Sequence, residues 1–232
     1  MLRQTAMHVH IGHNDGLGAL SMSDIVPTVY IVDDDISVRE SLEELVRHEG
    51  WQPEIFASAE SFLSHPRTSA PSCLVLDVNL PDLSGLDLQK RVAFDQIDIP
   101  IIFITGYGDI PMSVQAMKGG AVEFLTKPFH DEVLLTAISQ AIERSRTVLH
   151  DELETRTLRD CYASLSRREQ EVMALVVRGL MNKQIGGELG TSEITVKTHR
   201  GQVMHKMHAD SLAELIRKSE LLALSERFPK RC

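Results

Sequence analysis

The chain has 232 residues, 43% of them hydrophobic and 25% charged, and a net charge of −9; this composition is typical of one large or two ordinary globular domains. No apolar run approaches the roughly 20 residues that a membrane-spanning helix needs, and residues 1–26 lack the hydrophobic centre of a secretory signal. Cys73, Cys161 and Cys232 are far apart and form no CxxC pair, which argues against a disulfide framework or a cysteine zinc site. We therefore expect a soluble protein, with no membrane partner, in a reducing cytoplasm.

Strand-like and helix-like segments alternate from Thr28 to Arg146. Apolar, β-branched runs predict strands, and apolar residues at helical spacing predict helices. Five such βα units imply a doubly wound α/β fold, with a parallel sheet covered by helices on both faces. In chain order the predicted strands are 28–32, 52–57, 73–78, 100–105 and 121–126, and the predicted helices are 37–48, 58–65, 85–94, 111–118 and 131–146.

Polar residues follow several of these strands, and the carboxyl ends of parallel strands converge on one crevice. Carboxylates are hard oxygen ligands that suit Mg²⁺ better than zinc, and the backbone carbonyl of Asn79 is a natural further ligand. A hydroxyl and an ammonium group suit the oxygens of a phosphoryl group, whose transfer to a carboxylate requires a metal to offset the charge repulsion. The predicted site consists of Asp33, Asp34, Asp77, Thr105 and Lys127.

Each of these residues also has a simpler interpretation. The three aspartates at 33–35 can form a polar turn or a helix N-cap, and Thr105-Gly106 and Lys127-Pro128 can be ordinary loop chemistry. The occurrence of all five residues at strand ends of one pattern favours the phosphoryl site.

Four separated motifs lie in this region: Val-Asp-Asp-Asp at 32–35, Leu-Asp-Val-Asn-Leu-Pro at 76–81, Ile-Thr-Gly at 104–106 and Phe-Leu-Thr-Lys-Pro-Phe at 124–129. With them, residues 27–146 resemble the receiver domain of two-component response regulators. The resemblance implies a flavodoxin-like strand order, 2-1-3-4-5, and a sensor histidine kinase that phosphorylates Asp77, with Mg²⁺ held by Asp33 and Asp34. It also implies that Thr105 and Phe124 form a switch pair, that Lys127 contacts the phosphoryl group, and that the peptide bond before Pro128 is cis. Ordinary core packing is the alternative for Phe124.

The segment 147–161 is charged and contains no glycine or proline, so we expect a helical, semi-rigid linker. Its three leucines are too few to establish a coiled coil. Beyond it the period is helical throughout. Ser166 and Glu169 predict a capping box that opens a helix ending at Gly179, and further helices are predicted at 182–189, 193–207 and 211–222.

Two short helices joined by a tight turn, the second with a basic outer face, describe a helix-turn-helix; a generic helical bundle is the alternative. Residues 165–172 (Leu-Ser-Arg-Arg-Glu-Gln-Glu-Val) and 195–199 (Thr-Val-Lys-Thr-His) make residues 162–232 similar to the LuxR-type DNA-binding domain. Both halves together resemble a response regulator of the NarL/FixJ class. The resemblance implies base reading by Lys197, Thr198 and Gly201, with Arg200, His199 and Lys206 nearer the DNA backbone, and with Thr195 in the same interface. Gly201 and the pair Gly186-Gly187 depart from the usual pattern.

Charge supports a chain of two different modules. Residues 27–150 hold 9 Lys and Arg against 19 Asp and Glu, whereas residues 161–232 hold 12 against 8. Only the second module attracts a phosphate backbone, although scatter over a solvated surface would give a similar count.

The leading hypothesis is a phosphorylation-dependent transcriptional regulator, not an enzyme, that forms a homodimer when phosphorylated and binds double-stranded promoter DNA. A phosphatase with an aspartyl-phosphate intermediate is the enzymatic alternative, but Asn79 stands where such enzymes place an acid/base aspartate. Constitutive DNA binding with a degenerate receiver is a third hypothesis, disfavoured because all five site residues are present. Residues 1–26 are expected to be a disordered extension; His8, His10 and His13 could instead bind a metal, and Met22 is an alternative start.

Overall fold

Five parallel strands form the sheet of the first domain, in the order β2-β1-β3-β4-β5. The computed structural model describes residues 25–227, so the expected N-terminal extension, with its histidines and Met22, lies outside the described residues except for its last two positions. The strands are β1 (Thr28–Val32), β2 (Gln52–Phe56), β3 (Ser72–Asp77), β4 (Ile101–Thr105) and β5 (Glu123–Thr126). The predicted strand order is confirmed.

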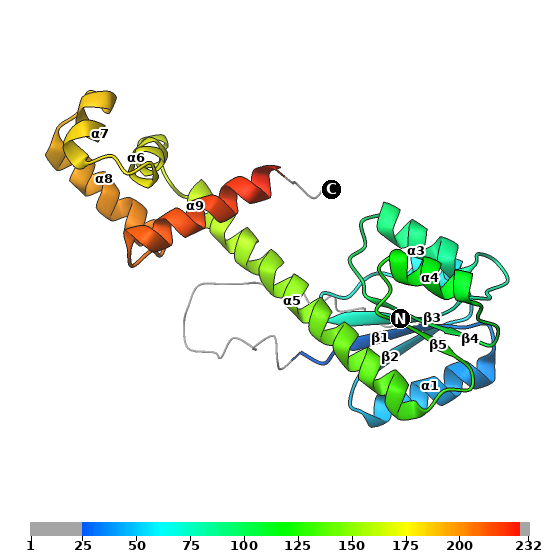
Figure 1. Cartoon of the computed structure of the whole chain (residues 1–232). Coiled ribbons are helices and arrows are strands. Elements are labelled where there is room, and N and C mark those ends of the chain that lie inside the picture. Colours follow the sequence, from blue (N-terminus) through cyan, green and yellow to red (C-terminus); the bar gives the residue numbers. More distant parts are fainter. Residues whose placement is uncertain (1–24, 228–232) are drawn as a thin grey trace, which may run out of the picture.

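Helices cover both faces of this sheet (Figure 1). On one face α2 (Ala59–Leu63), α3 (Gly85–Phe94) and α4 (Ile110–Lys118) cover a core that includes Tyr30, Leu76 and Phe103. On the other face α1 (Ile36–His48) and the following helix α5 cover Ile31, Val75 and Ile102. Adjacent strand residues thus contribute to opposite cores, as the period of two in a strand requires. This sandwich fixes the strand ends from which the polar residues project.

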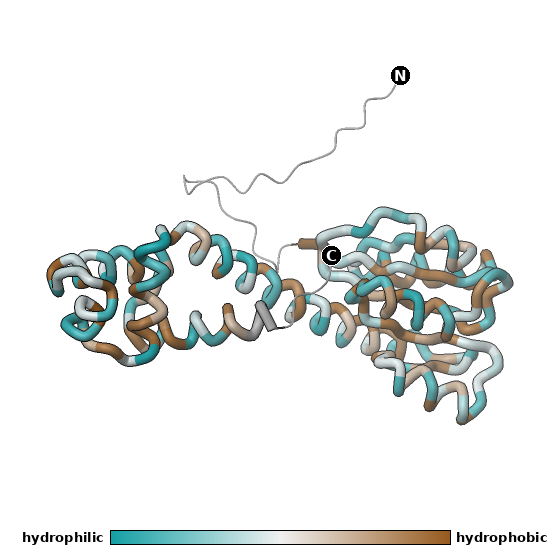
Figure 2. The backbone as a smooth tube through the Cα atoms, turned by 90° about the horizontal axis from the view of Figure 1, so that it is seen from above, coloured by the Kyte–Doolittle hydropathy of each residue, from teal (hydrophilic) through white to brown (hydrophobic). Residues whose placement is uncertain are grey.

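Helix α5 (Asp131–Ala163) is 33 residues long and continues without a break through the segment expected to be a linker. Its first part is buried against the sheet through Leu134, Ile138 and Ile142. Near its other end Leu158 is 9% exposed and belongs to the core of the helical domain. Figure 2 shows the two lobes of the chain joined through this helix. One helix therefore carries core side chains of both domains.

The second domain consists of the end of α5 and four further helices: α6 (Arg167–Val177), α7 (Asn182–Leu189), α8 (Glu193–Lys206) and α9 (Leu212–Arg227). The predicted capping box is present, since Ser166 Oγ accepts from the backbone of Glu169 and the Glu169 carboxylate accepts from the backbone of Ser166. Val172, Ile185 and Val203 are fully buried in its core. The fold class is as predicted: a receiver-type α/β domain followed by an all-α helix-turn-helix domain. Within residues 25–227 no helix has the length and apolarity to cross a membrane.

Gly186 has a packing reason that explains one departure from the expected motif. A Cβ atom at this position would lie 2.8 Å from the carbonyl oxygen of Thr191, closer than a carbon and an oxygen tolerate. Helix α7 therefore approaches the turn that precedes α8 only because residue 186 has no side chain. A Cβ at Gly187, the next residue, would meet nothing within 4 Å, so its replacement meets no steric obstacle.

Candidate functional site

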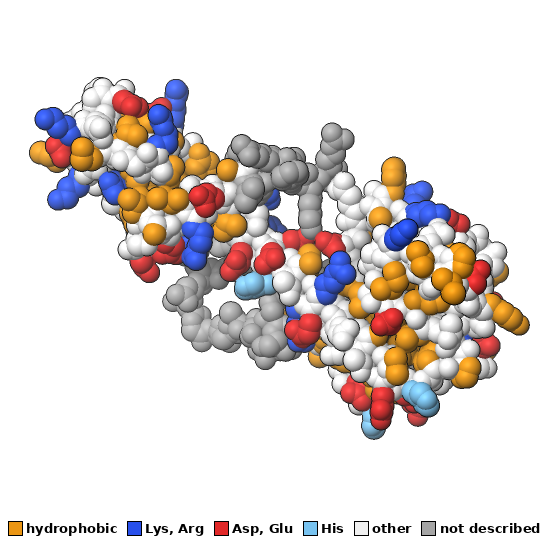
Figure 3. Space-filling model, viewed as in Figure 1, with side chains coloured by type: hydrophobic (Ala, Val, Ile, Leu, Met, Phe, Trp, Pro, Cys, Tyr) orange, Lys and Arg blue, Asp and Glu red, His pale blue; other side chains and the backbone are white. Residues whose placement is uncertain are grey.

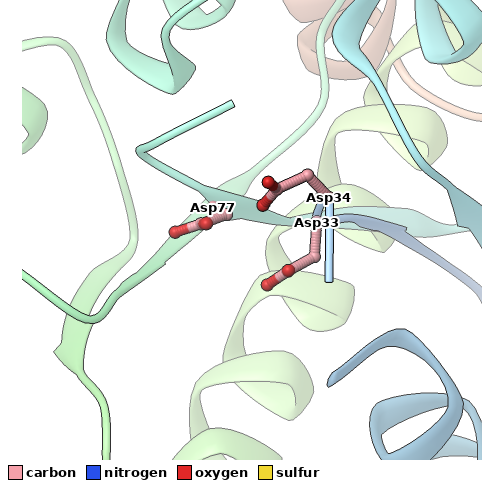
Figure 4. A group of neighbouring side chains, drawn as sticks. All are labelled: Asp33, Asp34 and Asp77. Atoms are coloured by element: carbon pink, nitrogen blue, oxygen red, sulfur yellow. The ribbon is translucent and has the colours of Figure 1, made fainter. Parts of the chain in front are cut away.

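Strand register brings three aspartates together at the carboxyl edge of the sheet. Val32 pairs with Leu76 across β1 and β3, so the next residues, Asp33 and Asp77, emerge side by side (Figure 4). Oxygen atoms of Asp33, Asp34 and Asp77 lie within 4.8 Å of one another. Asp33 is fully buried and Asp77 is 6% exposed, whereas Asp34 is exposed. The site is thus a cluster of negative charge in which two carboxylates are buried and one is open to solvent.

Lys127 supplies positive charge beside this cluster. It follows the end of β5, and its backbone N–H donates to the carbonyl oxygen of Thr105 over 2.7 Å. Its Nζ lies 2.6 Å from Oδ2 of Asp33 and 3.9 Å from Oδ2 of Asp77. The peptide bond between Lys127 and Pro128 is cis. The ammonium group therefore stands between the two buried carboxylates.

Asp77 combines burial with an uncommitted oxygen. Burial raises the pKa of its carboxyl group above the ordinary value; Lys127 opposes this shift and the charge of Asp33 adds to it. Its Oδ1 atom is buried and has no hydrogen-bond partner among the described residues. A buried carboxylate oxygen without a partner is unfavourable, and here it belongs to one of the three clustered aspartates. This oxygen is consequently available to a ligand or to a bond-forming reaction.

The hydroxyl of Thr105 is engaged in the loop that follows β4. Thr105 is fully buried, and its Oγ1 accepts from the backbone N–H of Tyr107 and from Nδ2 of Asn79, each over 3.2 Å. The same hydroxyl donates to the carbonyl oxygen of Tyr107 over 3.1 Å. In this conformation the hydroxyl is bonded to the loop and to Asn79, and no hydrogen bond joins it to the three aspartates among the described residues.

Phe124 lies on β5 beside the same loop. Its ring is half-buried, with its centroid 6.1 Å from that of Phe103. A Cβ atom on Gly108 would lie 3.0 Å from Cε1 of Phe124 and 3.2 Å from Cγ2 of Thr105. The loop is therefore packed against both members of the expected switch pair, and a movement of either residue must involve the loop.

Three residues of this site were absent from the sequence prediction. The Arg39 guanidinium donates to the carbonyl oxygen of Asp33 over 2.6 Å. Gly85, the first residue of α3, leaves no room for a Cβ beside the Asp77 carbonyl oxygen, and Tyr107 is the backbone partner of Thr105. Of these three residues, only Gly85 could have been recognised from the sequence. Glycine is unfavourable in a helix, so its presence at the start of a predicted helix indicates a close approach of another part of the chain.

Helix α8 presents the second group of predicted residues on the domain at the other end of the molecule. Lys197, Thr198 and Gly201 are exposed, whereas Thr195, His199 and Arg200 are half-buried. Figure 3 shows Lys and Arg side chains standing out from the end that carries α6 to α8. The residues assigned to base reading are thus the accessible ones.

Two basic residues of α8 are tied to neighbouring helices. Nη1 of Arg200 donates to Oδ1 of Asn182 over 3.2 Å. Nζ of Lys206 lies 2.7 Å from Oε2 of the nearly buried Glu169 and also donates to the carbonyl oxygen of Ser164. The bonds from Lys206 and from the backbone of Ser166 hold the pKa of Glu169 at about 2. Lys206 therefore joins α8 to the capping box of α6 and is not a free surface charge.

Family models match both domains. A model described as response regulator receiver domain matches residues 29–139, and one described as bacterial regulatory proteins, luxR family, matches residues 163–219. The chain is 52% identical over 210 residues to nodulation protein W of Bradyrhizobium diazoefficiens, covering 90% of this chain and 92% of that protein. It is 47% identical over 205 residues to the response regulator protein TodT of Pseudomonas putida, covering 88% and 90%.

Two further similarities cover most of the chain. The transcriptional regulatory protein FixJ of Rhizobium meliloti is 43% identical over 190 residues, which are 82% of this chain and 93% of that protein. The solved structure of the response regulator StyR aligns with a TM-score of 0.78 at 48% identity, covering 84% of this chain and 98% of that one. Sequence, strand order and the two family matches lead to one conclusion: the chain belongs to the NarL/FixJ class of response regulators, the transcriptional regulators of two-component systems that join a receiver domain to a LuxR-type DNA-binding domain.

Proposed function

We propose that Asp77 accepts a phosphoryl group from the phosphohistidine of a sensor kinase. The observation that carries the proposal is the carboxylate of Asp77. Its buried Oδ1 atom lacks a hydrogen-bond partner in the described structure, the group lies beside Asp33 and Asp34, and its Oδ2 atom is 3.9 Å from Nζ of Lys127. In the transfer, a bond forms between this carboxylate and phosphorus as the phosphorus–nitrogen bond breaks, and the imidazole leaves with a proton from solvent. Lys127 is placed to neutralise a phosphoryl oxygen.

Mg²⁺ is the cofactor that the donor set fits. Three carboxylates with oxygens within 4.8 Å, and no histidine or cysteine among them, are hard ligands with room for water. Asp33, Asp34, Asp77 and the Asn79 backbone carbonyl would hold the ion. When bound, it supplies positive charge that lowers the repulsion between the carboxylate and the phosphoryl oxygens.

The switch pair would transmit the modification. Phosphorylation offers the Thr105 hydroxyl a charged acceptor in place of the neutral Tyr107 carbonyl, and hydrogen bonds to charged groups are the stronger ones. Movement of Thr105 toward the phosphoryl group releases its bonds with Tyr107 and Asn79. The loop at Gly108 then moves, and the Phe124 ring turns into the space that is vacated.

Homodimerisation is proposed through α4 and β5, between Pro111 and Thr126. Next to the moving loop, Ile110, Val114 and Met117 of α4 are 79%, 44% and 45% exposed. Burial of such apolar side chains between two copies would stabilise a dimer. A dimer would place two copies of α8 on a promoter with two half-sites.

DNA binding is proposed for the exposed face of α8, in the major groove of a promoter. Lys197, Thr198 and Gly201 would contact base edges, and Thr195, His199 and Arg200 would lie toward the phosphates. The role of Lys206 is indirect in this proposal, since its ammonium group is paired with Glu169. The site of action would be the cytoplasm, where kinase and promoter are both accessible.

The full chain, incubated with a small phosphodonor and Mg²⁺, tests this function. Intact-protein mass spectrometry should find the mass of one phosphoryl group added, and a gel-shift assay should show tighter promoter binding. Asp77→Asn should abolish both effects. Asp95→Asn, a matched change at an exposed carboxylate at the far end of α3, should preserve them. An Asp77→Asn protein that still responds to the donor would refute the phosphorylation switch.

A further inference from the structure

The exposed face of α8 carries an apolar residue at its N-terminal end. Ile194, in the first turn of the helix, is 79% exposed, whereas Val196 and Val203 of the same helix and Met207, its C-cap, are at most 1% exposed. With about 3.6 residues per turn, Ile194 lies opposite this buried stripe. The residues that share its outer stripe are Thr198, Gly201 and His205, all exposed.

The two residues of this stripe nearest to Ile194 are Thr198 and Gly201. Thr198 Oγ1 donates to the carbonyl oxygen of Ile194 over 3.2 Å, so this hydroxyl is already bonded to the helix backbone. A Cβ at Gly201 would meet nothing within 4 Å, which leaves open space about two helical turns beyond Ile194. Lys197 stands at the edge of the stripe. The surface therefore offers an apolar contact flanked by a cation.

Such a surface has a specific counterpart in DNA. Among the groups on the floor of the major groove, the 5-methyl group of thymine is the apolar one, and it is read by apolar side chains. Residues in the N-terminal part of a recognition helix reach base edges, and Ile194 is two residues after the N-cap, Ser192. A β-branched side chain exposed at this point gains from burial against a methyl group.

We propose that Ile194 is a specificity-determining residue of this regulator, which contacts the 5-methyl group of a thymine in each half-site. The inference rests on the proposed DNA binding through α8 and adds to it the base, thymine, that this helix would prefer at one position of the half-site. It assigns the preference to an apolar contact made by Ile194, in addition to the hydrogen bonds expected from Lys197.

The test uses the full chain with a small phosphodonor and Mg²⁺. Duplexes that the protein retains from a random pool are sequenced, which gives the preferred half-site. Each thymine of that half-site is then replaced by uracil, which removes only the methyl group. For the wild-type chain, replacement of the contacted thymine in a single half-site should weaken binding about fourfold, as expected for one methyl group returned to water. Ile194→Ala should bind the thymine and uracil duplexes equally, and Ile194→Val should retain part of the discrimination.

Leu153→Ala is the matched control, because Leu153 is 43% exposed on α5; it should discriminate as the wild-type chain does. The inference is overturned if the wild-type chain tolerates uracil at every position or if Ile194→Ala keeps full discrimination. It is also overturned if Ile194→Ala changes only the oligomeric state, since Ile194 would then serve a protein contact. A wild-type chain that retains no duplex at all would refute the proposed DNA binding itself, a failure distinct from these.

Discussion

Asn79 donates a hydrogen bond from its side-chain amide to Oγ1 of Thr105 over 3.2 Å. The residue two positions after the proposed phosphoacceptor thus holds the hydroxyl on which the proposed switch depends. The same hydroxyl is held by the backbone of Tyr107, so the loop after β4 and the end of β3 share one hydrogen-bonding atom. This bond stabilises the conformation described here relative to one in which Thr105 turns toward Asp77.

Replacement of Asn79 by Ala should therefore favour the switched conformation without phosphorylation. One hydrogen bond contributes about 1 kcal/mol, so promoter affinity in the absence of a phosphodonor should rise by up to about fivefold, measured by gel shift. The same increase should occur in an Asp77→Asn background, where phosphorylation is excluded. Unchanged affinity in both backgrounds would show that the Asn79 bond does not restrain Thr105.

Loss of the ion pair between Lys206 and Glu169 should destabilise the helical domain. Lys206→Met leaves a nearly buried carboxylate without its cation, and we expect unfolding in urea to become easier by about 1–3 kcal/mol. Glu171→Gln, which alters a half-buried ion pair with Arg168 on α6, should cost less, because that pair is far more accessible to water than Glu169 is. An unchanged stability of Lys206→Met, combined with weaker DNA binding and a smaller salt slope, would instead indicate a direct phosphate contact.

The same pair predicts a dependence on pH. The pKa of Glu169 falls from 4.5 to about 2 in the folded protein, so its stabilising contribution is complete above about pH 4.5 and is lost as the pH falls toward 2. The difference in unfolding free energy between wild type and Glu169→Gln should be largest near pH 6 and should shrink across this window. A difference that stays constant down to pH 2 would contradict the assignment.

Two adjacent glycines of α7 should respond in opposite directions to the same substitution. Gly186→Ala places a Cβ 2.8 Å from the Thr191 carbonyl oxygen and should destabilise the domain by about 1–3 kcal/mol. Gly187→Ala meets no neighbour and should stabilise it by up to about 1 kcal/mol, through the higher helix propensity of alanine. Thermal unfolding followed by circular dichroism measures both. Equal effects would show that the close approach at Gly186 does not constrain the turn.

Leu158 should matter to the helical domain although it lies on the helix that begins in the receiver. Leu158→Ala removes a side chain that is 9% exposed in the second core and should cost about 2–4 kcal/mol. Leu153→Ala, at a 43% exposed position of the same helix, should cost less than about 0.5 kcal/mol. Chemical denaturation of the full chain measures the unfolding free energy of both variants. Equal losses would mean that Leu158 contributes no more to the second core than an exposed residue of α5 does.

The acidic site was predictable because it depends on topology. Residues that directly follow adjacent parallel strands must meet at one edge of the sheet, so Asp33 and Asp77 are fixed once the strands are recognised. The bonds of Thr105 were not predictable in this way, since a hydroxyl selects its partners from whatever the folded loop brings near. Similarly, Lys206 and Glu169 are 37 positions apart, and no periodicity relates them.

The boundary between the two domains also could not be predicted from the sequence pattern. Residues 147–161 contain Leu149, Leu153 and Leu158, and their spacing does not reveal which of them is buried. Leu158 is covered because α9 packs against α5 and the end of α5 thereby joins the core of the helical domain. Tertiary packing, and not local propensity, thus decides where the second core begins.

Because α5 is uninterrupted, the number of its residues between the two domains fixes both their rotation about the helix axis and their separation along it. Each residue inserted between 146 and 157 would rotate the DNA-binding domain by about 100° and move it about 1.5 Å along the axis. In a dimer joined at the receivers, the number of residues in this stretch would set the azimuth of each α8 toward the groove it enters. Insertions or deletions of a whole turn would preserve that azimuth, whereas those of half a turn would direct the two helices away from a common duplex.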